Sequence, residues 1–399
     1  MISSRFPWPM YKGGYNLRIL EFSRILKKNY YLDLLTLIRD RKEESEIEEL
    51  KKENIFKNIF FFKHSRLKEY INTFIGIFSN LPLQVSYYYS KSAVKWLKEN
   101  FKKYDLLYLN TVRTVKWVNH LKIKKVIDLI DAVSLNYLEG RRRGFGFWKI
   151  ITKIEIPRLI NFERKLFLQN LFEKYFITTS FDKEYLEKIT EKRFKNLIVI
   201  PTGVKEEILS MVKESEDIKE ENIIAFLGKM NTQPNQDAVL FFSKKIFPFL
   251  KKDIPDLKFY IIGIEPSKRI KDLEKIKGIK VTGYLKDLYP LLLKTKIIVA
   301  PMRFGAGIQN KILDGMSLGK TVIASKICAR GIQEAKSGEQ LEIIDSFNSS
   351  AWIEKIKETI NDSQKRKQMG EKAKELVEKN YRWKIIEEKL LTEIKKIVE

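Results

Sequence analysis

Short apolar runs, many rich in β-branched residues, alternate with longer segments of helical periodicity, and this alternation limits the folds open to the chain. Most runs are continuously apolar, as expected for parallel strands that helices cover on both faces. The predicted strands are Tyr31–Leu37, Leu106–Leu109, Lys125–Ile130, Tyr175–Thr178, Leu197–Ile200, Asn222–Leu227, Lys258–Ile262, Lys280–Thr282, Ile297–Pro301 and Thr321–Ala324. The helices expected among them include Asn16–Leu26, Asp237–Leu250, Leu285–Lys294 and Ile308–Leu318. The pattern predicts an α/β protein with doubly wound parallel sheets.

A break in the pattern divides the chain. The segment 201–222 is polar, acidic and poor in strand signals, so we interpret it as a connection between domains. We expect an N-terminal Rossmann-like domain over residues 1–205 and a C-terminal one over 206–379. Residues 380–399 form an amphipathic helix that we expect to cross back toward the N-terminal domain. Met1–Ser4 is short for a central strand, which indicates either a stunted strand or a start further upstream.

The charge balance points to anionic partners. Lys plus Arg number 76 against 51 Asp plus Glu, a formal net charge of +25. Such a field attracts nucleic acid, an anionic membrane surface or phosphorylated substrates. A compositional bias is the alternative explanation, because the excess is mostly lysine and accompanies abundant Ile, Asn, Phe and Tyr.

Cysteine and histidine usage excludes several kinds of site. Cys328 is the single cysteine, so internal disulfides and multi-thiolate zinc sites are impossible, and a reducing compartment fits. His64 and His120 are the only histidines, which argues against a histidine-rich metal centre. The sequence shows neither a signal peptide nor a run of ~18 uninterrupted apolar residues, so we expect no membrane span.

The segment Ile297–Ser325, IIVAPMRFGAGIQNKILDGMSLGKTVIAS, carries the strongest chemical signal. Its pattern predicts a strand, a glycine loop, a helix and a second strand. Gly305 and Gly307 let a ligand approach the backbone, and the unpaired amides that begin the next helix attract an anion. A diphosphate fits this arrangement.

Three charged side chains accompany this loop. Arg303 precedes it, and Lys311 and Asp314 lie one turn apart on one face of the helix. A cation there can hold a phosphate while the carboxylate accepts hydrogen bonds from a ribose diol, which suggests a nucleotide. The alternative is that Lys311 and Asp314 form an ordinary surface ion pair and the glycines only make a turn.

Two common phosphate motifs do not explain the segment. GAGIQN, which begins at Gly305, lacks the third glycine and the later acidic residue of a dinucleotide fingerprint. DGMSLGKT, which begins at Asp314, has three residues between its glycines where a P-loop needs four, and it precedes a strand. We therefore interpret Gly319 as a helix C-cap.

Together with other segments, this region resembles the retaining family 4 glycosyltransferases of the GT-B fold, in particular bacterial group 1 sugar transferases of cell-surface polysaccharide pathways. The resemblance covers nearly the whole chain and depends on the order and spacing of its motifs. These are RFPWPMYKGGYNLR (Arg5–Arg18), DLIDAVS (Asp128–Ser134), VIPTGV (Val199–Val204), AFLGKMNTQPNQDAVLFF (Ala225–Phe242), VTGYLKD (Val281–Asp287), Ala300–Ser325 and Tyr381–Trp383. It implies two facing Rossmann-like domains with a cleft between them.

The resemblance implies that the C-terminal domain binds a UDP- or GDP-linked sugar and the N-terminal domain binds the acceptor. Lys229 and Lys311 would hold the diphosphate with help from Arg303, and Asp314 would take the ribose hydroxyls. The other implied donor contacts are Gly13 and Gly14 beside the phosphates, Gly305, Ala306, Gly307 and Ile308 in the anion loop, and Gly283, Tyr284 and Leu285 beside the base.

The chain departs from the family pattern at two places. The family commonly has two glutamates eight positions apart, and here Ala306 stands for the first and Asp314 for the second. The family also has a second cation shortly after the position of Lys229, where this chain has Gln233 and Asn235.

The chemistry follows from the leaving group. Breaking the anomeric C–O bond leaves negative charge on a nucleoside diphosphate, which fixed cations such as Lys311 and Arg303 and helix amides stabilise without a metal. No D-x-D triplet occurs in the sequence, so we expect neither metal nor cofactor. Asp131, after the strand Lys125–Ile130, is the acidic candidate for contacting the donor sugar or the acceptor hydroxyl. Its alternative role is a helix N-cap.

The segment Arg141–Trp148, RRRGFGFW, is the main competing signal. Its middle matches the start of an RNA-binding RNP1 strand, but Trp148 and the helical pattern that continues to Leu168 depart from that motif. Another interpretation is a loop whose arginines meet anionic headgroups while its aromatic residues enter a membrane interface. A merely solvated loop is the third.

The resulting hypothesis is a retaining, metal-independent hexosyltransferase that moves a sugar from a nucleotide donor to a cell-envelope glycan or a lipid-linked acceptor. It would act in the cytoplasm, free or peripheral on the inner face of the membrane, without nucleic acid as a partner. Two alternatives stay open: a nucleotide-sugar 2-epimerase of the same fold and a basic RNA-binding protein.

Overall fold

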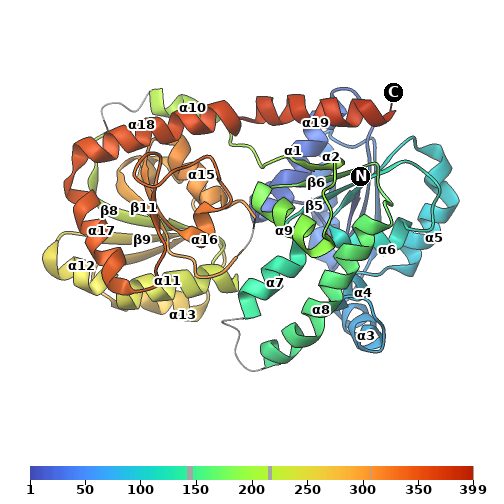
Figure 1. Cartoon of the computed structure of the whole chain (residues 1–399), viewed down its shortest axis with the longest axis horizontal. Helices are drawn as coiled ribbons and strands as arrows, with labels where there is room; N and C mark the ends of the chain where they lie inside the picture. The colour runs from blue at the N-terminus through green and yellow to red at the C-terminus, as the bar shows by residue number, and fades with distance from the viewer. Residues whose placement is uncertain (142–146, 214–217, 306, 399) are drawn as a thin grey trace. The chain divides into compact units, whose positions relative to one another are not determined.

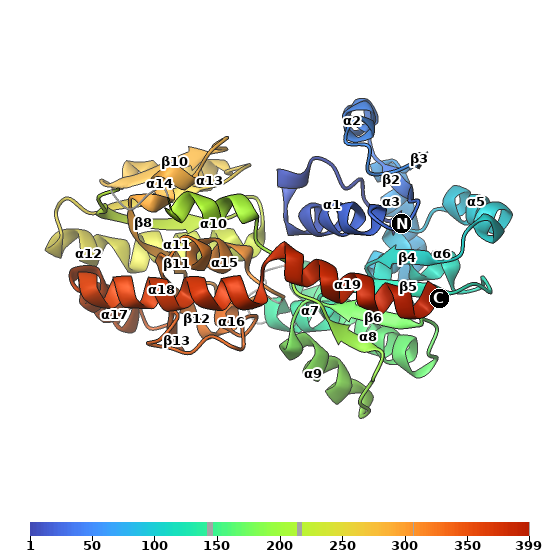
Figure 2. The ribbon, with the colours of Figure 1, turned by 90° about the horizontal axis from the view of Figure 1, so that it is seen from above.

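The computed structural model describes residues 1–141, 147–213, 218–305 and 307–398, which form two compact units. The N-terminal unit comprises Met1–Ile200 together with Glu387–Glu399, and the C-terminal unit comprises Pro201–Ile386. Each unit has its own parallel sheet flanked by helices, as Figure 1 and, from above, Figure 2 show.

The described part of the N-terminal unit has a seven-stranded parallel sheet with the order β3-β2-β1-β4-β5-β6-β7. Its strands are β1 (Ile2–Ser3), β2 (Asp33–Ile38), β3 (Asn58–Lys63), β4 (Leu107–Asn110), β5 (Lys125–Ile130), β6 (Lys174–Ile177) and β7 (Leu197–Val199). The chain builds one side of the sheet from β1 to β3 and then returns to the middle. The strands β1 and β4 therefore meet at the switch point of the sheet, where doubly wound folds bind ligands.

The central strand β1 is stunted. Ile2 and Ser3 are buried and pair with β2 on one side and β4 on the other, with Ser3 opposite both Thr36 and Asn110. Two residues suffice because the neighbouring strands cover them on both sides. The chain then leaves the sheet at its carboxyl edge.

The described part of the C-terminal unit has a six-stranded parallel sheet with the order β10-β9-β8-β11-β12-β13. Its strands are β8 (Glu221–Leu227), β9 (Lys258–Ile262), β10 (Ile279–Gly283), β11 (Thr295–Ala300), β12 (Thr321–Ser325) and β13 (Glu342–Ile344). Aromatic rings fill the core, and those of Phe242 and Phe259 lie 4.6 Å apart between centroids. The switch point of this sheet is between β8 and β11.

Helices connect the strands of both sheets. In the N-terminal part of the chain they are α1 (Gly14–Lys27), α2 (Arg41–Lys52), α3 (Arg66–Ile77), α4 (Leu83–Tyr87), α5 (Lys91–Asn100), α6 (Val115–Val118), α7 (Val133–Arg141), α8 (Phe147–Leu168) and α9 (Ser180–Thr190). Beyond these lie α10 (Glu206–Lys213), α11 (Gln233–Lys245), α12 (Phe247–Asp253), α13 (Lys268–Lys271), α14 (Tyr289–Leu293), α15 (Asn310–Ser317), α16 (Lys326–Ala329), α17 (Ser349–Asn361), α18 (Ser363–Asn380) and α19 (Trp383–Val398). Side-chain N-caps such as Asp40, Ser65 and Ser90 begin several of them.

The fold class and the ten strands predicted from the sequence are confirmed, with ends that differ by at most two residues. The predictions did not include the edge strands β3 and β13. The single helix expected over Asp237–Leu250 is wrong, because the chain breaks at Ile246 and a proline in the first turn of α12 begins a new helix. The helix expected from Leu285 begins only at Tyr289, with a proline again in its first turn.

A buried ion pair ties α1 to β5. Nε and Nη2 of Arg18 donate to the carboxylate of Asp128 at 2.7 and 3.0 Å, and both side chains are excluded from solvent. The same carboxylate accepts from the amide of Ile130 at 3.3 Å. A two-pronged contact sets orientation as well as distance, so the pair determines how α1 and the preceding Gly13 lie on the sheet.

Candidate active site

The loops after β8 and β11 begin side by side. β8 ends at Leu227 and β11 at Ala300, and the two strands pair directly. Ligands of doubly wound sheets bind outside the carboxyl ends of the strands at such a switch point. Lys229 lies two residues beyond β8 and Arg303 three residues beyond β11. The structure thus places both predicted cations at this edge.

Lys311 in α15 is a buried lysine. Its ammonium donates to Oδ1 of Asn235 at 2.7 Å, contacts the sulfur of Met302 at 3.1 Å, and lies 4.6 Å from the ring centroid of Phe226. Within the described residues it forms no ion pair with a carboxylate. Burial lowers the pKa of Lys311 to about 8. A buried cation with neutral partners is suited to receive an anion.

The close packing of α15 on its sheet brings Lys311 to this position. Gly315 faces the sheet, and a Cβ there would lie 2.9 Å from side-chain atoms of Ile298 and Val322. Only glycine allows this approach without displacement. Lys311, one turn earlier, consequently reaches the ring of Phe226 on β8.

Asn235 connects Lys311 to the end of β8. It accepts from the Lys311 ammonium through Oδ1, while its Nδ2 donates to the carbonyl of Lys229 at 3.0 Å. This amide lies in the first turn of α11 and is nearly buried. The resemblance identified Asn235 as a departure from the family, and the structure shows what the residue contacts.

Asp314 lies one turn after Lys311 but does not pair with it. Its carboxylate is half-buried; burial raises the pKa of Asp314 to about 7, and the charge of Lys205 opposes the rise. Burial and the charge of Asp314 together raise the pKa of Tyr289 beyond its usual range. The alternative of an ordinary surface ion pair between Lys311 and Asp314 is therefore wrong, because the two side chains have different neighbours.

Arg303 and Lys229 already face carboxylates. Arg303 makes a two-pronged contact with Asp237, with Nε 2.7 Å from Oδ2, and its guanidinium lies over the ring of Phe241. The ammonium of Lys229 is 3.3 Å from the carboxylate of Glu265. Of the three predicted cations, only Lys311 lacks a carboxylate partner among the described residues.

The glycine loop between β11 and α15 has the backbone that its glycines permit. Gly305 and Gly307 have φ values of +144° and +69°, which L side chains rarely adopt. The carbonyl of Gly305 accepts from Arg330 at 2.7 Å. Ile308 is half-buried, and α15 begins without a side-chain cap. Ala306 lies outside the described residues.

The loop predicted to border the base follows β10. Gly283 ends that strand with a φ of +67°. Tyr284 is exposed, whereas Leu285 packs against the core of the unit. The three residues lie at the carboxyl edge of the same sheet as Lys229.

In the N-terminal unit, Gly13 and Gly14 begin α1. Gly13 has a φ of +153°, and a Cβ there would meet no described atom within 4 Å. Nδ2 of Asn16 donates to the carbonyl of Pro9 at 3.0 Å, which holds the loop against the first turn of the helix. The predicted phosphate loop is therefore open at Gly13 and anchored beside it.

Asp131 follows β5 among other carboxylates. It accepts from the hydroxyl of Thr178 at 3.3 Å, and burial together with the charge of Asp182 raises the pKa of Asp131 to about 7. The N-cap interpretation is wrong, because Glu163 accepts from the first two amides of α7 and Asp182 from the amide just before them. The half-buried carboxylate of Asp131 thus caps none of these amides, and its contact with α7 is a side-chain hydrogen bond from Asn136.

Two arginines that the sequence interpretation missed lie at the N-terminal switch point. Arg5 follows β1 by two residues and Arg113 follows β4 by three, and these strands pair directly. The guanidinium of Arg5 lies 4.0 Å from the ring centroid of Tyr15, and that of Arg113 lies 5.2 Å from the ring of Tyr88. Each arginine comes shortly after a strand, but only the strand order brings the two together.

Neither arginine has a carboxylate partner in the described part of the chain. Nε of Arg113 donates to the amide oxygen of Gln84 at 3.1 Å, and the buried Nε of Arg5 has no hydrogen-bond partner. Burial, and then the charge of Arg5, lower the pKa of Arg113. Two neighbouring guanidiniums without a carboxylate partner among the described residues are suited to bind an anion.

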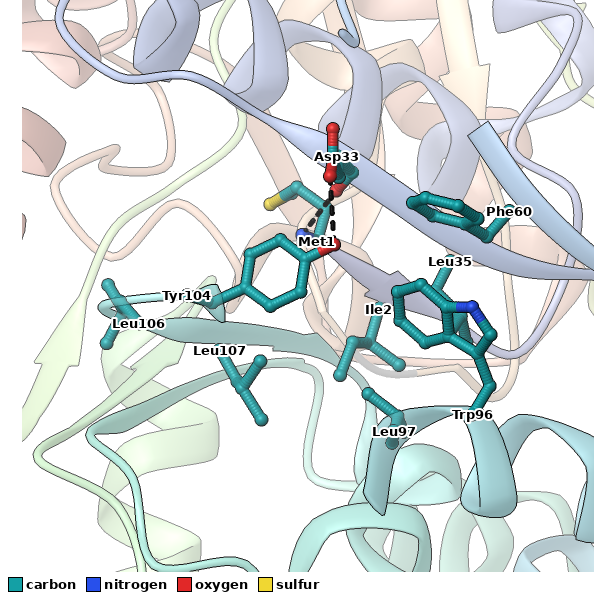
Figure 3. Close-up of a pocket in the computed structure, with 10 residues that line it drawn as sticks. All are labelled: Met1, Ile2, Asp33, Leu35, Phe60, Trp96, Leu97, Tyr104, Leu106 and Leu107. Carbon is teal, nitrogen blue, oxygen red and sulfur yellow. Dashed lines mark hydrogen bonds between the residues drawn. The ribbon is translucent and has the colours of Figure 1, made fainter. Parts of the chain in front are cut away.

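A small pocket lies at the opposite edge of the N-terminal sheet, where β1, β2 and β4 begin (Figure 3). It is lined by Met1, Ile2, Asp33, Leu35, Phe60, Trp96, Leu97, Tyr104, Leu106 and Leu107. Asp33 accepts from the Tyr104 hydroxyl and, through its carbonyl, from the amino group of Met1, both at 2.8 Å. These contacts at the amino ends of the strands hold the sheet together and lie away from the candidate site.

The competing segment Arg141–Trp148 is only partly described. Residues 142–146 lie outside the described residues, and α8 begins at Phe147, where an RNP1 strand would continue. The interpretation as an RNP1 strand is therefore wrong from Phe147 onward. The interpretation as a membrane loop stays a prediction. None of the described helices is both long and apolar enough to cross a membrane.

The family described as Glycosyl transferases group 1 matches residues 221–362. That range begins with β8 and contains Lys229, Lys311 and Asp314, so it includes the C-terminal switch point described above. Over residues 221–362 the chain is a group 1 glycosyltransferase, and the whole chain has the GT-B fold. The family and the enzyme class predicted from the sequence are confirmed.

Relatives of this group 1 glycosyltransferase include an uncharacterized 44.6 kDa protein in the cps region of Klebsiella pneumoniae, 23% identical over 356 residues that cover 86% of each chain. Anabaena HepE in complex with UDP-glucose has a TM-score of 0.66 at 14% identity, covering 99% of this chain and 98% of HepE. Sucrose-phosphate synthase from Thermosynechococcus elongatus has a TM-score of 0.72 at 13% identity, with the same coverage. These structures share the fold of the glycosyltransferase.

Proposed function

We propose that this glycosyltransferase is a retaining, metal-independent hexosyltransferase that uses a UDP- or GDP-linked sugar and a cell-envelope glycan or lipid-linked acceptor. The observation that supports this proposal most directly is the buried ammonium of Lys311. It has neutral partners behind the glycine loop at the β8–β11 switch point. Such a charge is costly to bury unless an anion joins it. The diphosphate of a nucleotide sugar supplies that anion.

The donor is held mainly by the C-terminal unit. Lys311 and the uncapped amides that begin α15 bind the diphosphate, and Lys229 adds a second cation. Arg303, held by Asp237, borders the phosphates and adds donors. Asp314 accepts from the ribose hydroxyls once it is ionised, above a pH of about 7.

Two loops complete the proposed donor site. Gly283–Leu285 borders the base from the end of β10, and Tyr284 offers an exposed ring there. The resemblance also implies a contribution from Gly13 and Gly14 of the N-terminal unit, and a Cβ at Gly13 would meet no described atom within 4 Å. The complex of Anabaena HepE with UDP-glucose supports a UDP-linked donor.

The proposed chemistry is stabilisation of the leaving group. Negative charge grows on the diphosphate as the anomeric C–O bond breaks, so Lys311 and the positive end of α15 bind the transition state more tightly than the ground state. Removing one such donor typically lowers kcat by roughly 10²–10³-fold. Asp131, with its pKa raised to about 7, is the group that receives the acceptor proton or contacts the sugar.

The N-terminal unit binds the acceptor in this proposal. Arg5 and Arg113 suit an acceptor that carries a phosphate or a carboxylate, because guanidinium forks bind both in two-pronged fashion. The relative in the cps region of Klebsiella pneumoniae supports a role in polysaccharide synthesis.

A thermal-shift experiment tests the donor site. UDP or GDP should raise the melting temperature of the wild type, and Lys311→Met and Asp314→Asn should remove the rise. Lys125→Met is the matched control, because Lys125 is a buried lysine at the start of β5. The proposal fails if both site variants keep the full shift. Incubation with a panel of nucleotide sugars then identifies the donor, and product analysis separates transfer from 2-epimerisation.

A further inference from the structure

Helix α3 turns its apolar side toward solvent. Seven large apolar side chains in it and directly after it are between 44% and 80% exposed: Leu67, Tyr70, Ile71, Phe74, Ile75, Ile77 and Phe78. At about 100° per residue, these positions fall within an arc of about 160° around the helix axis. An ordinary surface helix turns such an arc toward the core, so α3 has the opposite orientation.

Polar contacts on the inner side fix this orientation. Glu69 is 1% exposed, and its carboxylate accepts from Nε of Arg39 at 2.8 Å and from the hydroxyl of Tyr87 at 2.5 Å. Asn72 donates to the carbonyl of Tyr89 at 2.8 Å. Rotating α3 to bury its apolar arc would break these buried hydrogen bonds. In Figure 1, α3 lies beside α4 at the margin of the N-terminal unit.

Basic side chains border the apolar arc. Arg66 and Lys68 are exposed and lie about 100° to either side of Leu67, at the two margins of the arc. Neither forms an ion pair with a described residue. An apolar arc between two cations is complementary to a bilayer whose headgroups are anionic, because the cations reach the phosphates when the arc enters the interface.

The carbonyls in the last turn of α3 have hydrogen-bond partners within the protein. Arg158 donates to the carbonyls of Gly76 and Ile77 at 2.9 and 2.7 Å. Terminal helix carbonyls otherwise require water, and leaving them unpaired in an apolar phase is costly. Phe78, the most exposed of the seven side chains, follows this capped end directly.

We propose that this apolar arc of α3, with Arg66 and Lys68 at its margins, docks on the surface of an anionic lipid bilayer. The helix lies in the plane of the interface, and the net charge of +25 draws the protein to the membrane. The proposal does not depend on the transfer reaction. It differs from the membrane loop predicted at Arg141–Trp148, which involves other residues.

Vesicle sedimentation of the full chain tests the proposal. Wild type should bind phosphatidylcholine vesicles that contain about 30% phosphatidylglycerol, and Phe74→Ser/Phe78→Ser should weaken binding by about tenfold or more. Tyr31→Ser/Phe249→Ser is the matched control, because both of these aromatic residues are exposed elsewhere and the double variant should bind like wild type. Both double variants should fold, since they change exposed positions.

A second variant separates the two contributions. Arg66→Gln/Lys68→Gln should weaken binding to the anionic vesicles and leave any binding to pure phosphatidylcholine unchanged. Equal sedimentation of wild type and Phe74→Ser/Phe78→Ser would overturn the proposal, as would wild type that remains in the supernatant. Wild-type dimers that Phe74→Ser/Phe78→Ser dissociates, without vesicle binding, would also overturn it and identify the arc as an interface between copies. Nucleotide binding by the same samples tests the proposed function separately.

Discussion

The ammonium of Lys311 donates to Asn235 at 2.7 Å, and the same amide donates to the carbonyl of Lys229 at 3.0 Å. One neutral side chain thus joins the helix behind the glycine loop to the end of the paired strand. An amide orients the ammonium without offsetting its charge, so the charge remains available to a diphosphate. A carboxylate in the place of Asn235 would satisfy Lys311 internally.

Asn235→Asp tests this relationship. The new carboxylate should pair with Lys311, leave the fold intact and weaken UDP binding by about tenfold or more, because the pair must open or repel the phosphates. Calorimetric titration of wild type and variant at pH 7.5 measures the change. Asp237→Asn, which releases Arg303 at the same edge, is the comparison and should not weaken binding. An unchanged dissociation constant for Asn235→Asp would contradict the assignment of Lys311 to the diphosphate.

Proton linkage provides a second test. Burial lowers the pKa of Lys311 to about 8, and a bound diphosphate should raise it again, since an anion favours the charged form. UDP binding near pH 8.5 should therefore take up protons, whereas Lys311→Met should take up none. Titrations in two buffers of different ionisation enthalpy count these protons. Equal uptake by both proteins would assign the linkage to another group.

The unliganded protein should show the complementary effect. The unfolded chain binds the Lys311 proton more tightly than the folded one, so this lysine makes the free energy of unfolding rise as the pH increases from about 8 toward 10. The free energy of unfolding of Lys311→Met should lack this rise with pH. Denaturant unfolding of wild type and variant at several pH values measures this difference. The same pH dependence in both proteins would contradict the prediction.

Asp131→Asn should separate catalysis from donor binding. If Asp131 receives the acceptor proton, transfer should fall by roughly 10²–10⁴-fold, while UDP binding stays within error. The wild-type rate should rise with pH through about 7 as the carboxylate ionises. The raised pKa means that stability is lost as the pH rises from about 4 through 7, so the variant should not be less stable at pH 8. Wild-type transfer rates in Asp131→Asn would remove this residue from the mechanism.

Arg113→Gln should affect the acceptor and spare the donor. Losing one guanidinium from the pair at the switch point should raise the KM for an anionic acceptor by about tenfold, because a charge-assisted contact disappears. Slow hydrolysis of the nucleotide sugar should be unchanged. Arg113→Lys should restore part of the effect, and Arg24→Gln, on the surface of α1, should behave as wild type. A loss of hydrolysis with unchanged acceptor KM would reassign the site to the donor.

The alternation of strands and helices was sufficient to predict the fold, because continuous apolar runs of strand length are typical of parallel strands that helices cover on both faces. The glycine loop and Lys311 were also predictable, since they lie within one short segment. The environment of Lys311 was not, because Phe226 and Asn235 come from a strand and a helix far away in the chain. Arg5 and Arg113 were not identified as site residues from the sequence for the same reason, because only the pairing of β1 with β4 makes them neighbours.

The orientation of α3 shows another limit. This helix was not among those predicted from the sequence, and a helix with apolar residues on one side normally buries that side. Here Glu69 finds Arg39 and Tyr87, which come from other elements, and these contacts decide which side faces inward. A periodicity describes two faces but does not say which one meets the protein.

Replacing one partner of the buried ion pair between Arg18 and Asp128 should lower the free energy of unfolding strongly. Asp128→Asn leaves Arg18 charged without its partner and should lower the free energy of unfolding by about 3–5 kcal/mol. Arg18→Met/Asp128→Leu should recover much of that loss, because two apolar side chains leave no lone charge. Urea unfolding of the three proteins measures this. Equal stabilities of the single and double variants would contradict the prediction.

The large stability loss expected for replacing one partner alone has an evolutionary consequence. Any lineage that replaces Arg18 or Asp128 alone must survive an intermediate with an orphaned charge in its interior, and the glycine turn before α1 and the acidic residue after β5 would shift with it. Descendants should therefore retain both residues or exchange both.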